Sequence, residues 1–347
     1  MKLAMVTSIM LLAMAVSHDS VAFGADVGIN YGRIGNDLPP PKRVVEFLAN
    51  DLNLTIPLVR LFDPDPEALS ALATTNLIVC LGVKNEDLAP FAANIENARN
   101  WIHQFVTPYI KGGNGSLRLR YITAGNEVIP GAEAPSVLPA MTNLHQVLVE
   151  ENITDVFVST VLAASALGVS FPPSSGQFAP EVANILTDIS KFVYSNGAPL
   201  MINVYPFFAL VSDPDHISLD YALFQSTTAV VQDGDKQYFN LFDAIVDAFV
   251  AAMVRAVGKE DVRVVVAESG WPSAGSDHPF ATIDNAKTYN NNLKKHIQTV
   301  GGTPRRPDLN LETYIFALFN ENQKPPGTEQ NFGSFHPNLT DVYPLWR

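Results

Sequence analysis

Short apolar runs rich in β-branched residues recur along this chain, and segments with helical character separate them. The candidate strands are Val27–Tyr31, Leu58–Phe62, Leu77–Val83, Leu119–Ala124, Val156–Leu162, Leu200–Tyr205, Val262–Ala267 and Tyr314–Phe319. Strands that alternate with helices pair in parallel, because each helix carries the chain back to the same edge of the sheet. Eight such units in about 320 residues predict an α/β protein with a (β/α)8 barrel.

The candidate helices fall between these strands, and they include Arg43–Leu52, Ala98–Ile110, Ser136–Glu150, Leu241–Val257 and Asn285–Val300. An open, doubly wound sheet is the alternative architecture, but no glycine-rich phosphate loop follows any early candidate strand. The widest gap separates the sixth and seventh candidate strands, so we expect 207–240 to form a small excursion on the face where the strands end. Without an internal repeat beyond this period or a flexible linker, residues 25–347 are expected to form one domain.

The N-terminal segment has the pattern of a secretory signal peptide. Lys2 is followed by an apolar run from Leu3 to Val16, and small residues at Ala22 and Gly24 favour cleavage after Gly24. The run is shorter than the ~20 apolar residues that cross a bilayer, and no later segment reaches that length. We therefore expect a secreted protein, extracellular or in the cell wall, with no transmembrane segment; a vacuolar or anchored form stays open.

In a secreted protein, sequons indicate glycosylation sites and cysteines indicate disulfides. Asn-x-Ser/Thr sequons stand at Asn53, Asn114, Asn152 and Asn338, and each is a possible glycosylation site. Cys80 is the single cysteine, so the fold depends on its core and not on disulfides. The net charge of −13 argues against nucleic acid as a partner, because phosphate binding needs a basic surface. An uncharged ligand and a monomeric protein are expected.

Polar side chains gather where the candidate strands stop. They are Asn30 and Tyr31, Asp63, Asn126 and Glu127, Asn203 and Tyr205, Glu268, and Asn320 and Glu321. In (β/α)8 barrels this carboxyl-end face carries the active site. Glu268 follows the buried run Val264–Ala267, so we expect it to point from the barrel wall into a cleft. As a strand end, it is expected to tolerate replacement by Gln with little change in thermal stability.

Several kinds of catalytic site do not fit these residues. The histidines (18, 103, 145, 216, 278, 296 and 336) form no ligand pair at metal spacing, so no metal and no other cofactor is expected. Ser269 lacks the Gly-x-Ser-x-Gly elbow of serine hydrolases. Lys84 and Lys324 lie outside the apolar strands, where desolvation would prepare a lysine for a Schiff base.

A pair of carboxyl groups in one cleft is the arrangement that cleaves glycosidic bonds. One carboxyl group donates a proton to the leaving oxygen, and the other attacks or stabilises the anomeric carbon. Glu127 and Glu268 suit these tasks, because an ionised carboxylate raises the pKa of its neighbour. Asn126 could hydrogen-bond the sugar hydroxyl beside the reacting carbon. The simpler interpretation is that both glutamates are solvated strand ends in salt bridges.

Four motifs resemble one enzyme family. Val262–Gly275 resembles the nucleophile signature of the plant β-1,3-glucanases of glycoside hydrolase family 17, and Ile122–Glu127 resembles its acid/base segment. Phe319–Lys324 and Val27–Gly32 resemble the family's last strand end and its start, and the match spans about 26–346. The resemblance implies a retaining endo-hydrolase of β-1,3-glucan, with Glu268 as nucleophile and Glu127 as general acid/base.

The resemblance also implies supporting residues for substrate binding. Glu321, Lys324 and Glu329 match a charged group that would set the ionisation of the nucleophile and bind sugar hydroxyls. Tyr31 would lie close to the sugar that is cleaved. The segment Asn203–Phe208 would line the groove through Asn203, Tyr205, Phe207 and Phe208, with Trp271 near the nucleophile turn. Aromatic faces suit pyranose rings because both are flat and apolar.

Alternative functions stay open at this point. A β-1,3-1,4-glucanase or a β-1,3-glucan transglycosylase would use the same residues, and a catalytically silent glucan-binding wall protein is the more distant alternative. The last residues, Tyr343–Arg347, show neither a Cys-rich module nor an apolar anchor tail, so we expect a soluble family member or a chain cut at the end of the barrel. The biological role also stays open, because defence against fungal cell walls and remodelling of the plant's own callose would use the same reaction.

Overall fold

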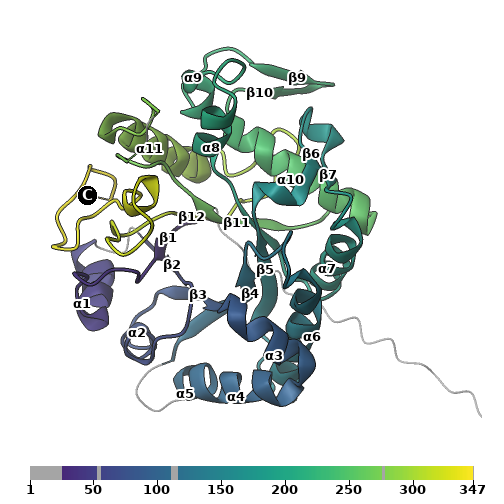
Figure 1. Cartoon of the computed structure of the whole chain (residues 1–347), viewed down its shortest axis with the longest axis vertical. Coiled ribbons are helices and arrows are strands. Elements are labelled where there is room, and N and C mark those ends of the chain that lie inside the picture. The colour runs from purple at the N-terminus through teal and green to yellow at the C-terminus, as the bar shows by residue number, and fades with distance from the viewer. Residues whose placement is uncertain (1–25, 53–55, 111–115, 276–277, 347) are drawn as a thin grey trace, which may run out of the picture.

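The structure, a computed structural model, describes residues 26–52, 56–110, 116–275 and 278–346. Within these residues, parallel strands close into a barrel, in the order β1 (Val27–Tyr31), β12 (Thr313–Ile315), β11 (Val264–Ser269), β8 (Leu200–Asn203), β5 (Phe157–Leu162), β4 (Arg118–Asn126), β3 (Ile78–Val83) and β2 (Leu58–Leu61) (Figure 1). The predicted (β/α)8 barrel is therefore confirmed. The predicted signal peptide, residues 1–24, lies outside the described residues.

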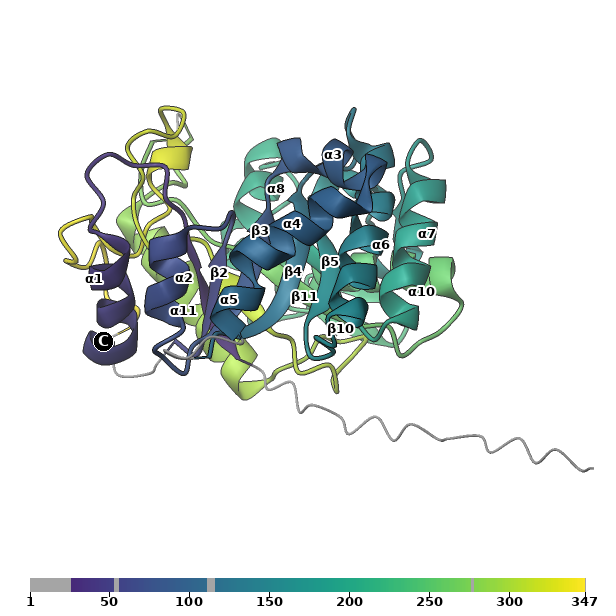
Figure 2. The same ribbon diagram turned by 90° about the horizontal axis from the view of Figure 1, so that it is seen from below.

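A ring of helices surrounds the barrel and covers its outer wall (Figures 1 and 2). The helices are α1 (Pro41–Glu46), α2 (Pro66–Leu72), α3 (Leu88–Ala93), α4 (Ile95–Phe105), α5 (Thr107–Ile110), α6 (Ala134–Glu150), α7 (Ala183–Ser195), α10 (Leu241–Val257) and α11 (Ile283–Thr299). Their apolar faces and the outward residues of the strands form one large buried cluster. Both faces of each strand are thus covered, which explains the nearly continuous apolar runs in the sequence.

The inside of the barrel is filled by side chains. A separate buried cluster contains Leu58, Cys80, Tyr121, Val161, Met201, Val265, Ala267 and Tyr314, all from barrel strands. On β1 the inward position is Gly28, where a Cβ atom would lie 2.7 Å from both Leu58 and Tyr314. The missing side chain makes room for the Tyr314 ring, so the barrel is a packed core and not a pore.

The barrel strands differ from their predicted bounds mainly at the carboxyl ends. Strand β1 matches its prediction, whereas β4 continues to Asn126 and β11 continues to Ser269. Strand β12 ends at Ile315 instead of Phe319, because the next backbone groups bond elsewhere. The Ala317 N–H donates to Phe332, and the Leu318 N–H donates to Asn30.

Several helix ends coincide with residues in the sequence that cap or interrupt helices. Helix α10 has its predicted bounds, with the Asn240 side chain as N-cap and Gly258 at φ 75° after its last residue. The predicted helix 98–110 is divided into α4 and α5, because Pro108 cannot donate a backbone hydrogen bond within a continuous helix. The predicted helix 43–52 is α1 followed by a π-helical turn, Phe47–Asp51.

Two insertions extend the barrel. The predicted excursion after the sixth barrel strand is present, as α8 (Pro206–Ser212), α9 (Leu219–Ala222) and the hairpin of β9 (Val231–Asp233) and β10 (Lys236–Tyr238) (Figure 1). A second hairpin, β6 (Leu167–Val169) with β7 (Gln177–Phe178), follows β5 and was not predicted. Among the described helices, none combines the length and the apolar character needed to cross a membrane.

Candidate active site

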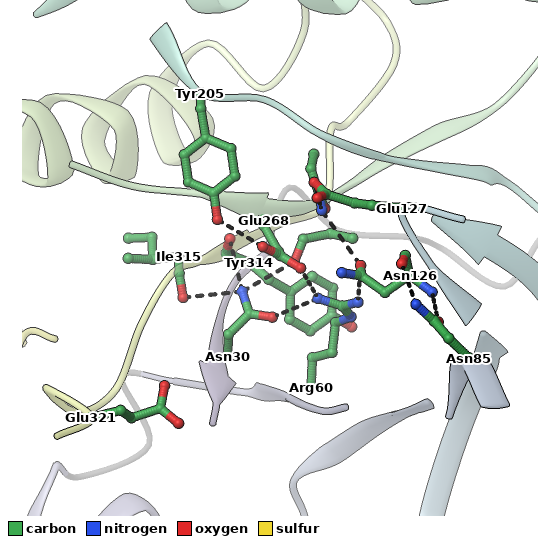
Figure 3. A network of polar contacts seen from close by, with 12 residues as sticks. Asn30, Arg60, Asn85, Asn126, Glu127, Tyr205, Glu268, Tyr314, Ile315 and Glu321 are labelled. Atoms are coloured by element: carbon green, nitrogen blue, oxygen red, sulfur yellow. Dashed lines mark hydrogen bonds and ion pairs between the residues drawn. The ribbon is translucent and has the colours of Figure 1, made fainter. Parts of the chain in front are cut away.

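Glu268 lies at an irregularity in β11, and this irregularity directs its side chain. The pairing of β11 with β8 shifts between Val266 and Glu268, which places Glu268 beside Asn203. The residue is only 5% exposed. Its Oε1 accepts a hydrogen bond from Arg60 Nη1 at 2.7 Å, and its Oε2 accepts one from the Tyr205 hydroxyl at 2.7 Å (Figure 3). Both carboxylate oxygens are therefore held in place by side-chain donors.

Arg60 is the residue that sequence reasoning missed. In β2 it stands two positions after Leu58, so strand alternation turns it into the barrel, where it is fully buried. Besides Glu268, its guanidinium donates to Asn30 Oδ1 and Asn126 Oδ1, each at 2.9 Å. It also lies 4.4 Å from the centre of the Phe62 ring. An arginine at an inward position of an apolar strand was the available signal, because a buried cation needs a buried anion.

Glu127 follows the end of β4 in an unusual backbone conformation. Gly125 and Glu127 have φ angles of 80° and 55°, and Glu127 is one of few non-glycine residues in this left-handed region. The register of β4 on β5 shifts between Thr123 and Asn126. The Glu127 N–H then donates to Val161 at 2.9 Å. These local features aim the Glu127 carboxyl group towards Asn203, whose Nδ2 donates to Oε1 at 2.7 Å.

The environment of Glu127 favours its protonated form. Burial raises the pKa of this carboxyl group, and the negative charge of Glu268 raises it further. The hydrogen bond from Asn203 and the positive charge of Arg60 lower the pKa of Glu127, but they do not offset the first two effects. Glu268 forms an ion pair with the buried Arg60, whereas the side-chain hydrogen bond of Glu127 within the described residues comes from the neutral Asn203 amide. The two carboxyl groups therefore lie in different surroundings, and those of Glu127 raise its pKa.

Glu127 and Glu268 lie between two cavities that together form one cleft. The aromatic half, of about 510 Å³, is lined mainly by Ala163, Ala164, Tyr205, Phe208, Ala209, Ile245, Phe316 and Phe332. The charged half, of about 690 Å³, is lined mainly by Tyr31, Arg33, Asp63, Lys84, Asn85, Glu86, Asn126, Glu321 and Lys324. Both glutamates line both halves, as do Phe316 and Glu329. An extended ligand in the cleft would therefore pass over the carboxyl pair.

Most residues that the sequence suggested for substrate binding line this cleft. They are Tyr31, Asn126, Asn203, Tyr205, Phe208, Glu321, Lys324 and Glu329. Phe208 is 41% exposed, so its ring is available to a ligand. The Asn126 Oδ1 is taken by Arg60, which leaves its Nδ2 as the group that can serve a ligand.

The structure corrects the expectations for Trp271 and Phe207. Trp271 is fully buried, its Nε1 donates to the Phe280 carbonyl at 2.9 Å, and its ring packs on Tyr289. Phe207 is 1% exposed and packs on Trp271 with ring centres 5.2 Å apart. Helix α8 turns Phe207 inward and Phe208 outward, because consecutive helical residues face different directions. Both Trp271 and Phe207 are packing residues behind the cleft wall.

The charged group of Glu321, Lys324 and Glu329 lines the same cavity as Glu268. Within the described residues, neither Glu321 nor Lys324 forms a hydrogen bond or ion pair with Glu268, whose ion pair is with Arg60. Glu321 accepts from the Ile34 N–H at 2.6 Å and pairs with Lys324 at 3.2 Å. The role of this group in the ionisation of Glu268 stays a prediction. Glu268 is buried and ion-paired, so it is not the solvated strand end that the sequence suggested. We therefore expect Glu268→Gln to lower the thermal stability, contrary to the expectation from the sequence.

The four sequons fall into two groups. Asn152 and Asn338 are exposed, Asn152 two residues after the end of α6 and Asn338 in the last ten residues of the sequence. Asn53 and Asn114 lie outside the described residues. The predicted glycosylation of these sites stays a prediction.

Comparisons with known proteins agree with this geometry. A Hordeum vulgare sequence with the provisional name glucan endo-1,3-beta-glucosidase GVI is 48% identical over 91% of this chain and 95% of its own length. A Vitis vinifera glucan endo-1,3-beta-glucosidase is 40% identical over 97% of this chain and 96% of its own. Among solved structures, CJP38, a beta-1,3-glucanase and allergen of Cryptomeria japonica pollen, aligns with a TM-score of 0.86 and 40% identity, covering 92% of this chain and 98% of that one.

A second solved structure, from a study of two plant beta-glucan endohydrolases with distinct substrate specificities, aligns with a TM-score of 0.85 and 40% identity. That alignment covers 92% of this chain and all of the other. The sequence profile described as Glycosyl hydrolases family 17 matches residues 27–346. The match spans the barrel, both glutamates and the cleft, and it makes the protein a glycoside hydrolase enzyme. This chain belongs to family 17 of the glycosyl hydrolases.

Proposed function

We propose that this enzyme is an endo-hydrolase of β-1,3-glucan that retains the anomeric configuration, with Glu268 as nucleophile and Glu127 as general acid/base. The names of relatives at 40 to 48% identity support the substrate. The arrangement of the cleft supports the roles, because Glu268 is ion-paired with Arg60 and the pKa of Glu127 is raised.

The proposed reaction has two displacement steps. In the first, the Glu268 carboxylate attacks the anomeric carbon, the glycosidic bond breaks, and Glu127 gives its proton to the leaving oxygen. This step forms a covalent glycosyl-enzyme. In the second step, Glu127 takes a proton from water, whose oxygen displaces Glu268 and restores the starting configuration. Such a double displacement requires the two carboxyl groups to lie ~5–5.5 Å apart.

The contrast between the surroundings of the two carboxyl groups is the observation that carries this proposal. Arg60 and Tyr205 each donate to one carboxylate oxygen of Glu268, which holds the proposed nucleophile in place. Burial and the charge of Glu268 raise the pKa of Glu127, as a proton donor at mildly acidic pH requires. Asn126 lines the cleft beside both glutamates, and its Oδ1 is bonded to Arg60, so its Nδ2 can serve the sugar hydroxyl next to the reacting carbon.

The decisive experiment is proton NMR of the anomeric signals during digestion of a linear β-1,3-glucan, with a mixed-linkage β-1,3-1,4-glucan in parallel. We expect β-anomeric reducing ends to appear first and the β-1,3 polymer to be shortened preferentially. Initial α-anomers would contradict the retaining mechanism. Preference for the mixed-linkage polymer would keep the mechanism but change the substrate, and disaccharide transfer to added oligosaccharides would indicate a transglycosylase.

The nucleophile is tested by Glu268→Gln, with Glu133→Gln as control at an exposed glutamate outside the cleft lining. We expect the first variant to lose at least ~10³-fold in turnover on the glucan. Because Glu268 neutralises buried Arg60, thermal melting of both variants is measured, and turnover is compared only where the variants are folded. Substantial turnover by folded Glu268→Gln would refute the assignment.

We also propose that the enzyme is secreted, cleaved after Gly24, glycosylated at sequons including Asn152 and Asn338, and monomeric. The exposure of these two asparagines supports their modification. Expression of the full chain in plant cells, followed by N-terminal sequencing, glycopeptide mass spectrometry and light scattering of the secreted protein, tests these points. Retention of residues 1–24, unmodified sequons or a dimeric mass would each contradict the corresponding proposal.

A further inference from the structure

Asn85 holds the backbone of Asn126 with both polar atoms of its side chain. The Asn85 Oδ1 accepts from the Asn126 N–H at 2.8 Å, and its Nδ2 donates to the Asn126 carbonyl at 3.0 Å (Figure 3). The partners are 41 residues apart in sequence. A side-chain amide that satisfies both groups of one residue imitates the pairing of a neighbouring β-strand.

The position of Asn85 explains this imitation. Strand β3 ends at Val83, which pairs with Ala124 of β4. Two residues further along, position 85 would stand opposite Asn126 if β3 continued, and there the Asn85 side-chain amide replaces the backbone groups of a strand. Asn85 opens the 3-10 turn Asn85–Asp87, and the buried Leu88 follows at the start of α3, so a packed element holds the turn.

Glycine at position 125 makes the close approach possible. Gly125 has φ 80°, and a Cβ atom there would lie 2.8 Å from Leu88 and Val128 and 3.2 Å from the Asn85 Oδ1. The segment that follows, Asn126 and Glu127, carries the Asn126 amide and the proposed acid/base. On its other side the Glu127 N–H is bonded to Val161 of β5. Asn85 therefore restrains this segment from the β3 side while β5 restrains it from the opposite side.

We propose that Asn85 is a positioning residue for proton transfer, which fixes the Asn126 backbone and thereby the place of the Glu127 carboxyl group. This inference rests on the acid/base role proposed for Glu127. Without Asn85, the left-handed conformation of Glu127 loses a restraint on one side, and its carboxyl group samples positions farther from the leaving oxygen. A displacement of about 1 Å at such a group can lower a rate ~10²-fold.

The test compares substrates whose leaving groups need a proton to different degrees. Laminarioligosaccharides leave as sugar alkoxides and need protonation, whereas a 2,4-dinitrophenyl β-laminaribioside leaves as a stable phenolate without it. We expect Asn85→Ala to lower kcat on the oligosaccharide roughly 10- to 100-fold. On the dinitrophenyl substrate, the rate of glycosyl-enzyme formation should change less than about threefold, because no proton is needed in that step.

Control variants separate the possible reasons for a change. Asn97→Ala removes an exposed asparagine that donates to the Pro90 carbonyl, away from the cleft, and should match the wild type on both substrates. Asn85→Asp keeps the acceptor for the Asn126 N–H and loses the donor, so its loss on the oligosaccharide should lie between those of the wild type and Asn85→Ala. Because Asn85 is exposed, Asn85→Ala and Asn85→Asp are both expected to melt at a temperature close to that of the wild type.

Glu127→Ala distinguishes failure of this inference from failure of the proposed function. Relative to the wild type, Glu127→Ala should lose more turnover on the oligosaccharide than on the dinitrophenyl substrate. This preference for the dinitrophenyl substrate should be larger than that of Asn85→Ala. If Glu127→Ala lacks this preference, the proposed acid/base role fails. If Glu127→Ala shows it and Asn85→Ala does not, the positioning role of Asn85 is wrong. Because Asn85 also lines the cleft, a rise in KM of equal size on both substrates with kcat unchanged would mean direct sugar contact and would overturn the inference.

Discussion

At the scale of single residues, the site depends on one buried cation. Arg60 joins the inner layer of the barrel to the cleft, because one guanidinium binds Asn30, Glu268 and Asn126 at once. Its planar set of donors suits this task, and a lysine ammonium could not reproduce the same geometry. The pair Arg60–Glu268 has side-chain exposures of 1% and 7%, so water does not screen it.

We predict that Arg60→Met destabilises the protein and nearly abolishes turnover. The variant keeps much of the side-chain volume but leaves the Glu268 carboxylate buried without its counter-charge, which typically costs about 3–5 kcal/mol. Urea unfolding at neutral pH measures this loss. Arg43→Met is the control, because the Arg43–Asp51 pair is 46% and 42% exposed and should contribute at most about 1 kcal/mol. Equal losses for both variants would contradict the special role of Arg60.

A second residue-scale prediction concerns the pH dependence of activity. The Asn203 amide donates to the Glu127 carboxylate and so lowers the pKa of Glu127. Asn203→Ala removes this donor, and the pKa of Glu127 should rise. Because the proton donor must be protonated, the alkaline limb of kcat/KM should move to higher pH. Profiles of kcat/KM against pH for both enzymes measure the limb, and a shift to lower pH would refute the assignment.

At the scale of elements, the excursion after β8 is tied to the barrel by a buried carboxyl group. Asp247 of α10 accepts from the Tyr238 hydroxyl of β10 at 2.9 Å and from Thr303 and the Arg305 N–H, at 2.5 and 2.9 Å. Burial raises the pKa of Asp247 from 3.8 to about 6, although these three hydrogen bonds lower it. One helix, one hairpin and one loop therefore meet at a single titrating group.

The Asp247 cluster predicts a pH dependence of stability. The folded pKa of Asp247 is above the unfolded pKa, so the folded protein binds this proton more tightly, and ionisation lowers the free energy of unfolding. This contribution should fall by roughly 3 kcal/mol between about pH 3 and pH 7. The difference in unfolding free energy between wild type and Asp247→Asn, measured in urea, should follow that fall. Exposed Asp215→Asn is the control, and the same pH profile for Asp215→Asn and Asp247→Asn would refute the prediction.

At the scale of the whole molecule, one end of the barrel is closed by a buried ion pair and the other end carries the cleft. At the amino-end, Glu312 is 1% exposed, pairs with Arg120 at 2.6 Å and accepts from the Tyr314 hydroxyl at 2.8 Å, which closes the barrel. At the carboxyl end, the cleft extends to either side of Glu127 and Glu268. A cleft that continues past the carboxyl pair in both halves suits the inside of a polymer chain.

The two-sided cleft predicts internal cleavage. Early in the digestion of a soluble linear β-1,3-glucan, we expect the mean chain length to fall steeply while little glucose forms, because the cleft has room for sugar units on both sides of the carboxyl pair. Size-exclusion chromatography and glucose assays on the same samples measure this. Glucose as the main product from the first minutes would indicate attack at chain ends instead.

The aromatic half of the cleft predicts a difference between two equally exposed phenylalanines. Phe208 and Phe239 are each 41% exposed, but only Phe208 lines the cleft. Loss of the apolar contact of Phe208 with a sugar ring should cost about 1–2 kcal/mol, which is a rise of roughly 5- to 30-fold in KM. Steady-state kinetics on a soluble glucan should show this rise for Phe208→Ala and none for Phe239→Ala. The opposite order would place the apolar sugar contact elsewhere.

The architecture was predictable because its signal is local and repeated. Apolar runs of strand length alternate with helices, which predicts a parallel sheet, and eight such units predict a barrel. In such a barrel all carboxyl ends meet on one face, so Asn126, Glu127, Asn203 and Glu268 were expected together although they are far apart in the chain. Strand ends were less predictable, as at β12, because they depend on which distant groups take the backbone hydrogen bonds.

By itself, then, the sequence determined the barrel, the face of the cleft and the carboxyl pair, since alternation and strand direction follow from local pattern. Only the tertiary structure decided which side chains meet. Arg60 and Glu268 are 208 residues apart, and their contact depends on barrel register and on the shift in β11. Tertiary packing likewise buries Trp271, which was expected to contact the ligand from the turn after Glu268. Contacts across the barrel are set by the closure of the whole sheet, which no local pattern encodes.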